Sequence, residues 1–479
     1  MRTTGTGGAG GATLLPGDRV HLVGIGGAGM SALAWILLER GHAVSGSDLR
    51  GGLTVSALEA MGAQVHVGHD AGLVADAALV ARSTAVPDTN PELRRARELG
   101  LPVLHRAELL AALVEGREGM FIAGTHGKTT TTSMAVVCLQ AAGRDPSFAI
   151  GGALHDAGTS AHHGTGEWFV AEADESDRSL LAFAPDCAVV TNVELDHHDV
   201  YADLADVTRT LTDFLARRRP GAPAIVCLDD PGASALVGAI DPPVITYGEH
   251  PDAEVRLDDL QLRPAGSRAR LRRGREDLGE LRLRLLGRHN LLNATAAATA
   301  ALWAGADIDP IRSALASFSG AQRRWQRMGE VRGVAVVDDY AHHPTELAAT
   351  LGAARQAGGS GRVIAVFQPH RFSRTAAIGE ALGGALAAAD VAIVTDVYAA
   401  GEAPVAGVTS ALVLDGVRAA GVEAHGASGV RELLALLLEL VQPGDLVLTL
   451  GAGDISQVGP QLLSALQGHD QRRGRGRDG

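Results

Sequence analysis

Cysteine and aromatic residues are both scarce in this sequence. The 479 residues include three cysteines, and aromatic residues account for 3% of the chain. Cys138, Cys187 and Cys227 are too widely spaced for a disulfide framework or a zinc site with paired ligands, so we expect small buried residues in a reducing compartment. Together with 61 glycines, this composition favours α/β domains with glycine-rich nucleotide-binding turns over a β-sandwich.

The sequence also lacks a long apolar run and an excess of positive charge. No apolar stretch reaches the roughly 18 residues that a membrane-spanning helix needs. Residues 1–18 have no apolar core of the kind found in secretory signals. The formal net charge of −13 provides no basic footprint for nucleic acid. We therefore expect a cytoplasmic protein without nucleic-acid or membrane partners.

The length of the chain predicts three domains, at roughly 150 residues per domain. We place them at residues 19–117, 118–327 and 328–467, with disordered tails at 1–18 and 468–479. The predicted fold class is α/β, with a Rossmann-like N-terminal domain, a central phosphate-loop domain with a mostly parallel sheet, and a Rossmann-like C-terminal domain.

The most informative stretch is a glycine loop between a strand and a helix. Met120–Ala123 is an apolar strand, Gly124–Gly127 a tight turn, and the run after Lys128 has no helix breaker before Gly143. The usual phosphate loop has four residues between its glycines, and this one has two. Backbone N–H groups and the helix N-terminus would still bind phosphate, with Lys128 as a point charge and the next residue, a threonine, holding Mg²⁺. The alternative is an ordinary strand-to-helix turn with an exposed lysine.

A second glycine loop lies near the N-terminus. The strand Val20–Val23 leads into the glycine-rich run Gly24–Ser31, an apolar helix and a strand that ends at Asp48. This pattern predicts a nucleotide diphosphate on the loop and a ribose on the acid, although the glycines alone would also suit close strand–helix packing. The polar residues after the strands 78–81 and 102–104 fall where an open parallel sheet places its ligand contacts.

Two acidic segments follow predicted strands of the central domain. Glu172 begins a run with five polar or acidic residues in six, which is either a solvated loop or the source of a Mg²⁺ ligand. His197 and His198 lie between aspartates without the partners of a zinc site, which favours a hard metal held with phosphate. Asn290 and Asn293 would suit an adenine edge, but the residues alone favour a helix N-cap as the role of Asn290.

The C-terminal segment repeats one pattern four times. The strands 334–337, 363–367, 391–395 and 446–450 each end in a polar cluster, which predicts a doubly wound domain with one ligand-facing edge. Before them, the Arg323–Arg324 pair reads as a hinge element whose arginine can reach a transferring phosphate.

Taken together, these motifs resemble the Mur ligase family over roughly residues 20–460. They include GIGGAGMS at Gly24, GTHGKTTTT at Gly124, EADESD at Glu172, GRHN at Gly287, DDYAHHPTE at Asp338 and FQPHR at Phe367. The resemblance implies an ADP-forming ligase of peptidoglycan synthesis. It would use ATP and Mg²⁺ to join L-alanine to the lactyl carboxylate of UDP-N-acetylmuramate through an acyl phosphate. We also expect a monomer or weak homodimer.

The resemblance also assigns residues to roles. ATP would be bound by Gly124, Thr125, His126, Gly127, Lys128, Thr129, Thr130, Asn290, Asn293, Arg324 and Asp339. Mg²⁺ would be held by Thr129, Glu172 and His197. The UDP-sugar would contact Gly26, Gly27, Gly29, Ser31, Asp48, His69, Ser83 and Arg106, and the amino-acid side would include His342, Arg371 and Arg374. The catalytic set would be Lys128, Arg324 and His342.

Several features depart from the family pattern or leave alternatives open. Trp325 replaces a usual Phe, Thr84 a usual Ser and His198 a usual Met, so either His197 or His198 can face the metal. No lysine lies between Lys128 and Arg324, which excludes a carbamylated lysine near the metal. The rival functions are a ligase for a recycled tripeptide, an NAD-dependent oxidoreductase based on the first glycine loop, and a motor or signalling ATPase.

Overall fold

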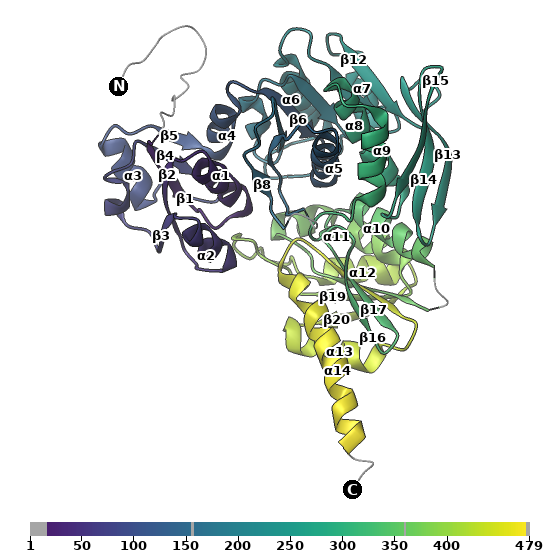
Figure 1. The fold of residues 1–479 in the computed structure, drawn as a ribbon. Helices are drawn as coiled ribbons and strands as arrows, with labels where there is room; N and C mark the ends of the chain where they lie inside the picture. Colours follow the sequence, from purple (N-terminus) through teal and green to yellow (C-terminus); the bar gives the residue numbers. More distant parts are fainter. Residues whose placement is uncertain (1–16, 155–157, 359–360, 476–479) are drawn as a thin grey trace. The chain divides into compact units, whose positions relative to one another are not determined.

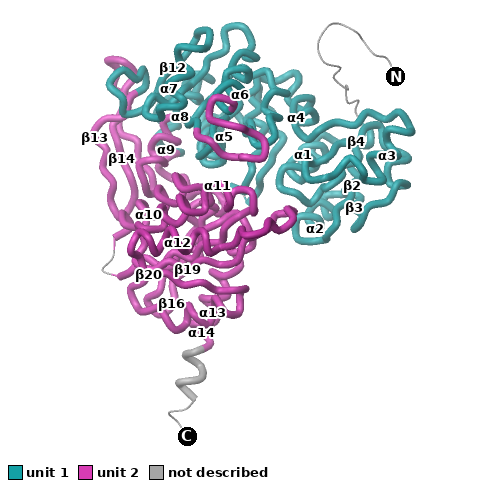
Figure 2. The backbone as a smooth tube through the Cα atoms, turned by 180° about the vertical axis from the view of Figure 1, so that it is seen from behind, with its two compact units in different colours: residues 1–193, 207–255, 296–314 teal, residues 194–206, 256–295, 315–479 magenta. Residues whose placement is uncertain are grey.

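The computed structural model describes residues 17–154, 158–358 and 361–475. The predicted N-terminal tail therefore lies almost wholly outside the described residues. In the described ranges, no helix is both long and apolar enough to cross a membrane. The chain forms two compact units (Figure 2): unit 1 contains residues 1–193, 207–255 and 296–314, and unit 2 contains residues 194–206, 256–295 and 315–479.

The first sheet of unit 1 is fully parallel and carries the N-terminal glycine loop (Figure 1). Its strand order is β3-β2-β1-β4-β5, so the order reverses between β1 and β4, which is where an open sheet of this kind binds ligands. The strands are β1 (Arg19–Val23), β2 (Ala43–Asp48), β3 (Gln64–Val67), β4 (Leu79–Arg82) and β5 (Val103–His105), and the helices are α1 (Ala28–Glu39), α2 (Leu53–Ala60), η1 (Ala71–Val74), α3 (Pro91–Glu98) and α4 (Arg106–Val114).

The second sheet of unit 1 carries the phosphate loop. Its strands follow the order β12-β11-β10-β6-β9-β7-β8, parallel apart from the β7–β8 pair. They are β6 (Glu118–Ala123), β7 (Ser147–Ala149), β8 (Ala161–His162), β9 (Trp168–Glu172), β10 (Cys187–Val190), β11 (Ala224–Cys227) and β12 (Val244–Gly248). The helical elements are α5 (Lys128–Ala141), η2 (Ser179–Ala182), α6 (Leu204–Ala216) and α7 (Pro231–Leu236). The three cysteines are buried and free, as predicted.

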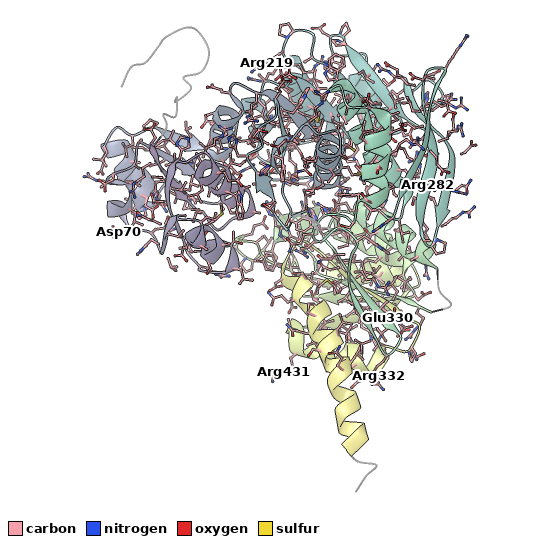
Figure 3. The ribbon with its side chains drawn as sticks, in the orientation of Figure 1. Asp70, Arg219, Arg282, Glu330, Arg332 and Arg431 are labelled. Carbon is pink, nitrogen blue, oxygen red and sulfur yellow. The ribbon has the colours of Figure 1, made fainter. Side chains whose placement is uncertain are left out.

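Unit 2 contains a region that the sequence analysis did not predict. The strands β13 (Val255–Arg263), β14 (Gly266–Arg273) and β15 (Glu276–Leu283) are neighbours, and β14 and β15 pair in antiparallel fashion around a turn at Gly274, whose φ is +58°. In β14 the arginines alternate with the buried residues Ser267, Ala269 and Leu271, which is the period-two pattern of a half-buried strand that the sequence analysis did not use. Figure 3 shows Arg282 on the outer side of β15, where it is exposed. The helices α8 (Arg288–Trp303) and α9 (Ile308–Ser317) follow, and their residues 296–303 and 308–314 belong to unit 1.

Unit 2 also contains a six-stranded sheet with the order β16-β17-β21-β18-β19-β20, in which only β16 is antiparallel to its neighbour. The four strands predicted for this domain are confirmed as adjacent and parallel. The strands are β16 (Gln326–Val331), β17 (Val334–Asp339), β18 (Val363–Phe367), β19 (Val391–Thr395), β20 (Glu423–Ala427) and β21 (Leu446–Leu450). The helices are α10 (Pro344–Ala357), α11 (Phe372–Ala385), η3 (Leu386–Ala388), α12 (Ala411–Ala419), α13 (Gly429–Leu440), η4 (Asp454–Gln457) and α14 (Val458–Arg475).

The end of α14 corrects one sequence-based prediction. The helix continues to Arg475, although we predicted a disordered tail from residue 468 onward. Glutamine and arginine, which are common in this stretch, have good helix propensity, so polarity alone did not mark the end of the helix.

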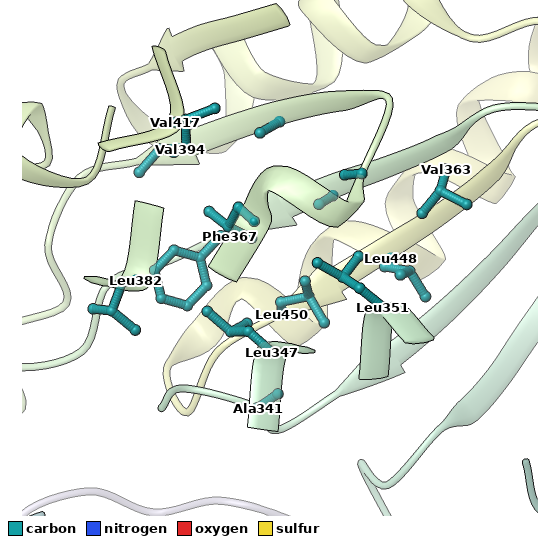
Figure 4. Packing of buried hydrophobic residues seen from close by; sticks show 14 of the residues in the cluster. Ala341, Leu347, Leu351, Val363, Phe367, Leu382, Val394, Val417, Leu448 and Leu450 are labelled. Atoms are coloured by element: carbon teal, nitrogen blue, oxygen red, sulfur yellow. The ribbon is translucent and has the colours of Figure 1, made fainter. Parts of the chain in front are cut away.

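Helices cover both faces of the six-stranded sheet that contains β18, as its continuous apolar strands require. On β18, Val363 and Phe367 belong to one buried cluster with side chains from α10, α11 and α12, whereas Ile364 and Val366 belong to another with side chains from α13 and α14. Figure 4 shows the ring of Phe367 in the first cluster. The alternation fixes the register of the strand and thereby the positions of the polar residues that follow it.

Candidate active site

The phosphate loop of unit 1 is held open by its own glycines and by the end of β10. Gly124 has a φ of +121°, and a Cβ atom there would lie 2.2 Å from the Thr191 hydroxyl. Gly127 also has positive φ, at +79°, and precedes α5. The backbone N–H of His126 donates to Asn192 Oδ1 at 2.7 Å, and its carbonyl accepts from Thr191 Oγ1 at 2.6 Å. The sequence analysis missed Thr191 and Asn192 as supports of this loop.

Lys128 is the first residue of α5, directly after the loop, and pairs with an acid from the turn that follows β9. Its Nζ donates to both carboxylate oxygens of Glu175, at 2.9 and 2.8 Å, and to the carbonyls of Gly124 and Thr125, at 2.7 and 3.2 Å. Burial disfavours the charged lysine, but the carboxylates of Glu175 and then Asp174 outweigh it and raise the pKa of Lys128. The lysine is therefore a permanent cation beside the loop.

The two predicted Mg²⁺ ligands of unit 1 are oxygen donors near this loop. Thr129 is in the first turn of α5 and is 8% exposed. Glu172 is the last residue of β9, paired with Ile122 of the strand that leads into the loop. Its Oε1 accepts from the N–H of Gly151 at 2.7 Å. A hydroxyl and a carboxylate form the hard donor set that Mg²⁺ prefers.

The N-terminal glycine loop is fixed by the end of β2. The carbonyl of Ser47 accepts from the N–H groups of Gly24 and Ile25 at 2.8 and 3.1 Å, and Asp48 Oδ2 accepts from the N–H of Gly26 at 3.0 Å. Asp48 is the last residue of β2. Its side chain therefore supports the glycine loop, a role that the sequence analysis did not predict beside its predicted contact with a ribose. The helix begins at Ala28, earlier than predicted, which places Gly29 and Ser31 in its first turn.

Arg106 lies directly over this loop. A Cβ atom at Gly29 would lie 2.8 Å from Cδ of Arg106, so the glycine leaves room for the arginine side chain. Asp174 pairs with Arg106 at 3.6 Å. The structure therefore brings together two predicted sugar-binding residues that are 77 positions apart in the sequence (106 − 29 = 77).

A buried acid that the sequence analysis missed supports the same loop. Glu92 is fully buried and accepts from Ser47 Oγ at 2.7 Å, interacts with Nε2 of His21 at 2.9 Å and Nδ1 of His69 at 3.0 Å, and accepts from the N–H of Asp70 at 3.2 Å. Its hydrogen bonds from His21 and Ser47 overcome burial and lower its pKa. His69, predicted to contact substrate, is in this structure a partner of Glu92. The only feature of the sequence that pointed to Glu92 was the run Asn-Pro-Glu, which is typical of a helix N-terminus.

A cavity of about 800 Å³ adjoins the sugar-side residues in unit 1. Its lining includes Thr84, His105 and Asp177, and the first two are the neighbours of Ser83 and Arg106 in the sequence. The Thr84 hydroxyl donates to Asp177 Oδ2 at 2.7 Å and is 2.9 Å from Nε2 of His105. The threonine that replaces a usual serine therefore still uses its hydroxyl.

In unit 2, Asn290 and Asn293 lie side by side in the first turns of α8. Asn290 Nδ2 donates to the carbonyl of Leu286 at 2.7 Å, and Asn293 Nδ2 is 3.4 Å from Asn290 Oδ1. Because the helix begins at Arg288, the alternative of Asn290 as an N-cap is wrong. Both side chains are 7% exposed.

The two arginines of the Arg323–Arg324 pair differ in how tightly they are held: Arg323 makes several short hydrogen bonds to the described residues, whereas Arg324 does not. Arg323 donates to Asp338 Oδ2 at 2.9 Å and to the carbonyl of Gly451 at 2.6 Å. Arg324 stacks on Tyr340 at 5.0 Å, and its Glu346 partner is 3.8 Å away. Only Arg324 therefore keeps donors that an arriving phosphate can recruit easily.

Asp339 and His342 follow β17. The carboxylate of Asp339 accepts from the N–H groups of Trp325 and Ala341 at 2.7 and 2.9 Å, and burial raises its pKa to about 6. Nδ1 of His342 is 2.9 Å from the carbonyl of Tyr340, and burial lowers its pKa to about 4. His342 is therefore neutral at pH 7, with Nδ1 carrying the proton that the carbonyl accepts.

The two arginines predicted on the amino-acid side are both paired with acids of the segment 194–206. Arg374 is 5% exposed and donates to both oxygens of Asp196, at 2.8 and 3.0 Å from one nitrogen. Arg371 donates to Asp199 at 3.2 Å. Arg374 is thus positioned to hold the segment rather than to contact a ligand directly. Burial disfavours the charged acid, but Arg374 holds the pKa of Asp196 far below its usual range.

The segment also holds the two histidines considered as metal ligands. His197 has a φ of +51°, and its Nε2 is 3.7 Å from Asp196 Oδ2. Nε2 of His198 is buried and has no hydrogen-bond partner among the described residues. The choice between the two as metal ligand stays open.

Comparison with known proteins identifies the family to which this chain belongs. The family models Mur ligase family catalytic domain, Mur ligase middle domain, and Mur ligase glutamate ligase domain match residues 19–118, 122–301 and 323–453, respectively. The chain belongs to the Mur ligase family. A UDP-N-acetylmuramate–L-alanine ligase of Acidothermus cellulolyticus is 49% identical over 459 residues, covering 94% of this Mur ligase and 95% of the relative.

Solved structures agree with the fold. The crystal structure of a UDP-N-acetylmuramate–alanine ligase from Thermotoga maritima has a TM-score of 0.80 and 28% identity, covering 94% of this chain and 99% of that one. A murein peptide ligase from Psychrobacter arcticus has a TM-score of 0.72 at 22% identity, with coverage of 94% and 99%, and shows the shared fold alone. The predicted family and the three-domain α/β fold class are confirmed.

Proposed function

We propose that this Mur ligase joins L-alanine to the lactyl carboxylate of UDP-N-acetylmuramate in peptidoglycan synthesis, with conversion of ATP to ADP and phosphate. The observation that carries the proposal is the pairing, within unit 1, of a phosphate loop containing Lys128 with a glycine loop covered by Arg106. Nearly full-length relatives at up to 49% identity carry this activity in their names.

The reaction follows from the charges that the site must bring together. The lactyl carboxylate attacks the γ-phosphorus of ATP, and ADP leaves, giving an acyl phosphate. The alanine amine then attacks the acyl carbon, and phosphate leaves through a tetrahedral intermediate. The first step brings two anions together, the carboxylate and the ATP phosphates, and the second step expels phosphate. Lys128 and Arg324 therefore contribute by positioning these groups and neutralising their negative charge.

Mg²⁺ is the metal that the donors fit. Thr129 and Glu172 would hold it with phosphate oxygens, and His197 of unit 2 is the third predicted ligand. When bound, the ion neutralises charge on the phosphates. The oxidoreductase alternative would leave Lys128 and Glu172 without a role.

We assign His342 an orienting role toward the amine. Its pKa of about 4 makes it a weak base at neutral pH, whereas its fixed Nδ1 leaves the other ring nitrogen as an acceptor of defined direction. The alanine ammonium would then lose its proton to water.

The deciding assay measures ADP release with ATP, Mg²⁺ and UDP-N-acetylmuramate. L-Alanine should support turnover, glycine and L-serine less, and a tripeptide least. Faster turnover with the tripeptide would favour a recycling ligase, and ADP release without the UDP-sugar would indicate a simple ATPase. Bound NADH fluorescence would revive the oxidoreductase.

Further properties complete the proposal. We place the enzyme in the cytoplasm, where its nucleotide substrates are, as a monomer or weak homodimer. Because the predicted residues are divided between two units, substrates should draw the units together before reaction. Solution scattering with all ligands should show a smaller radius of gyration than the free enzyme, and an unchanged radius would contradict this.

A further inference from the structure

Two adjacent acids each hold a cation that the proposed substrates require. Glu175 occupies Lys128 through two hydrogen bonds, and its side chain is 3% exposed. Asp174 pairs with Arg106 at 3.6 Å. An ammonium has three donors, and here four protein oxygens already surround it, so an arriving phosphate has to displace at least one of them.

The two acids are adjacent residues of one hydrogen-bonded turn. Asp174 Oδ1 accepts from the N–H of Ser176 at 3.0 Å, and its carbonyl accepts from Leu180 at 3.2 Å. The carbonyl of Glu175 accepts from the N–H of Arg178 at 2.9 Å. These bonds hold both acids in one short turn after β9, so the two carboxylates extend from adjacent residues of the same turn.

We propose that Asp174 and Glu175 are paired positioning residues that stand in for substrate anions in the free enzyme and couple the two sites. The inference rests on the proposed function, because it takes Lys128 to bind ATP phosphate and Arg106 to bind the anionic part of the UDP-sugar. A sugar that displaces Asp174 loosens Glu175 and frees Lys128 for ATP, and the converse holds by linkage. Glu175 thereby restricts ATP use when no acceptor is bound.

Calorimetry with a non-hydrolysable ATP analogue and UDP-N-acetylmuramate tests the coupling. In the wild type, each ligand should tighten the other about fivefold or more. Glu175→Gln should bind the analogue alone more tightly than the wild type, because no carboxylate competes for Lys128, and the coupling should fall toward onefold. Asp174→Asn should bind the sugar alone at least as tightly and also lose the coupling.

Matched controls separate this from a general charge effect. Glu118→Gln and Asp213→Asn remove exposed acids of the same unit and should leave both affinities and their coupling unchanged. Thermal unfolding confirms that each variant is folded. If Glu175→Gln does not fold, Asp174→Asn decides alone, because its carboxylate is 37% exposed and tolerates replacement.

Lys128 provides a direct readout, since it is the only lysine in the sequence. An acetylating reagent followed by mass spectrometry should modify Lys128 faster in Glu175→Gln than in the wild type. In the wild type, UDP-N-acetylmuramate alone should also raise the rate. Weaker analogue binding by Glu175→Gln, or unchanged coupling in both variants, would overturn the inference. Failure of the wild type to bind either ligand would instead overturn the proposed function.

Discussion

The two units arrange their predicted binding groups in different ways. In unit 1, each predicted phosphate loop is contiguous in the sequence, as at Gly24–Ser31 and Gly124–Lys128, and is braced by the end of a neighbouring strand. In unit 2, side chains from distant segments assemble the predicted amino-acid side, as with Arg374 and Asp196, which are 178 residues apart. Backbone loops can be recognised from a short motif, whereas side-chain assemblies depend on the whole fold.

The largest effect is expected at the cation of unit 1. Lys128→Ala should lower kcat about 10³-fold or more, because one preorganised charge on the transferring phosphate is lost. Binding of UDP-N-acetylmuramate should persist, since the first glycine loop is separate in the sequence. Steady-state kinetics and calorimetry measure the two effects. Undiminished ligation would contradict the role of this loop.

Unit 2 should be most sensitive at its buried ion pair. Asp196→Asn should cost about 3 kcal/mol of stability at pH 7, because Arg374 is then left charged, buried and unpaired. The pKa of Asp196 is lowered in the folded state, so its contribution is complete above the unfolded value near ~4 and is lost as pH falls below it. Urea denaturation at pH 7 and pH 3 measures both.

Asp415→Asn provides the control for this stability effect. Asp415 pairs with Arg418 on the surface, and its side chain is 72% exposed, so its replacement should change stability little at either pH. An equal loss in both variants would show that the buried pair has no special importance.

A smaller effect is expected at the glycine beneath Arg106. Gly29→Ala should raise KM for UDP-N-acetylmuramate about tenfold, or ~1.4 kcal/mol, with little change in KM for ATP, because the new Cβ displaces the arginine. Gly352→Ala, where no atom lies within 4 Å of the added carbon, should change neither. An unchanged KM for UDP-N-acetylmuramate in Gly29→Ala would contradict a binding role for Arg106.

The smallest effect is expected at His342. His342→Gln should lower kcat less than about tenfold and leave the shape of the pH–rate profile between pH 6 and 9 unchanged. With a pKa of about 4, the histidine is already neutral across that range, so its removal cannot shift a limb of the profile. A drop of 100-fold together with a shifted limb would identify it as the base.

Much of the fold could be predicted from local patterns. Apolar strands followed by glycine loops or polar clusters identified several parallel strands in each of the three sheets, because buried parallel strands read as continuous apolar runs. The parallel strands β3, β7, β11, β12 and β20 were not predicted. The arginine-rich β14 was missed although its arginines alternate with buried residues, because the many charges suggested a surface segment. The extent of α14 was underestimated because helix propensity continues into its polar end.

The sequence by itself determined the two glycine loops and the family to which the chain belongs, because glycine spacing, the lysine and the following threonines act within one turn of backbone. The tertiary structure decided which acids hold those cations. Glu175 on Lys128, Glu92 beneath the first loop and Asp196 on Arg374 are contacts between segments far apart in the sequence. Such pairing depends on which strand ends lie side by side, and composition and spacing do not encode that order directly.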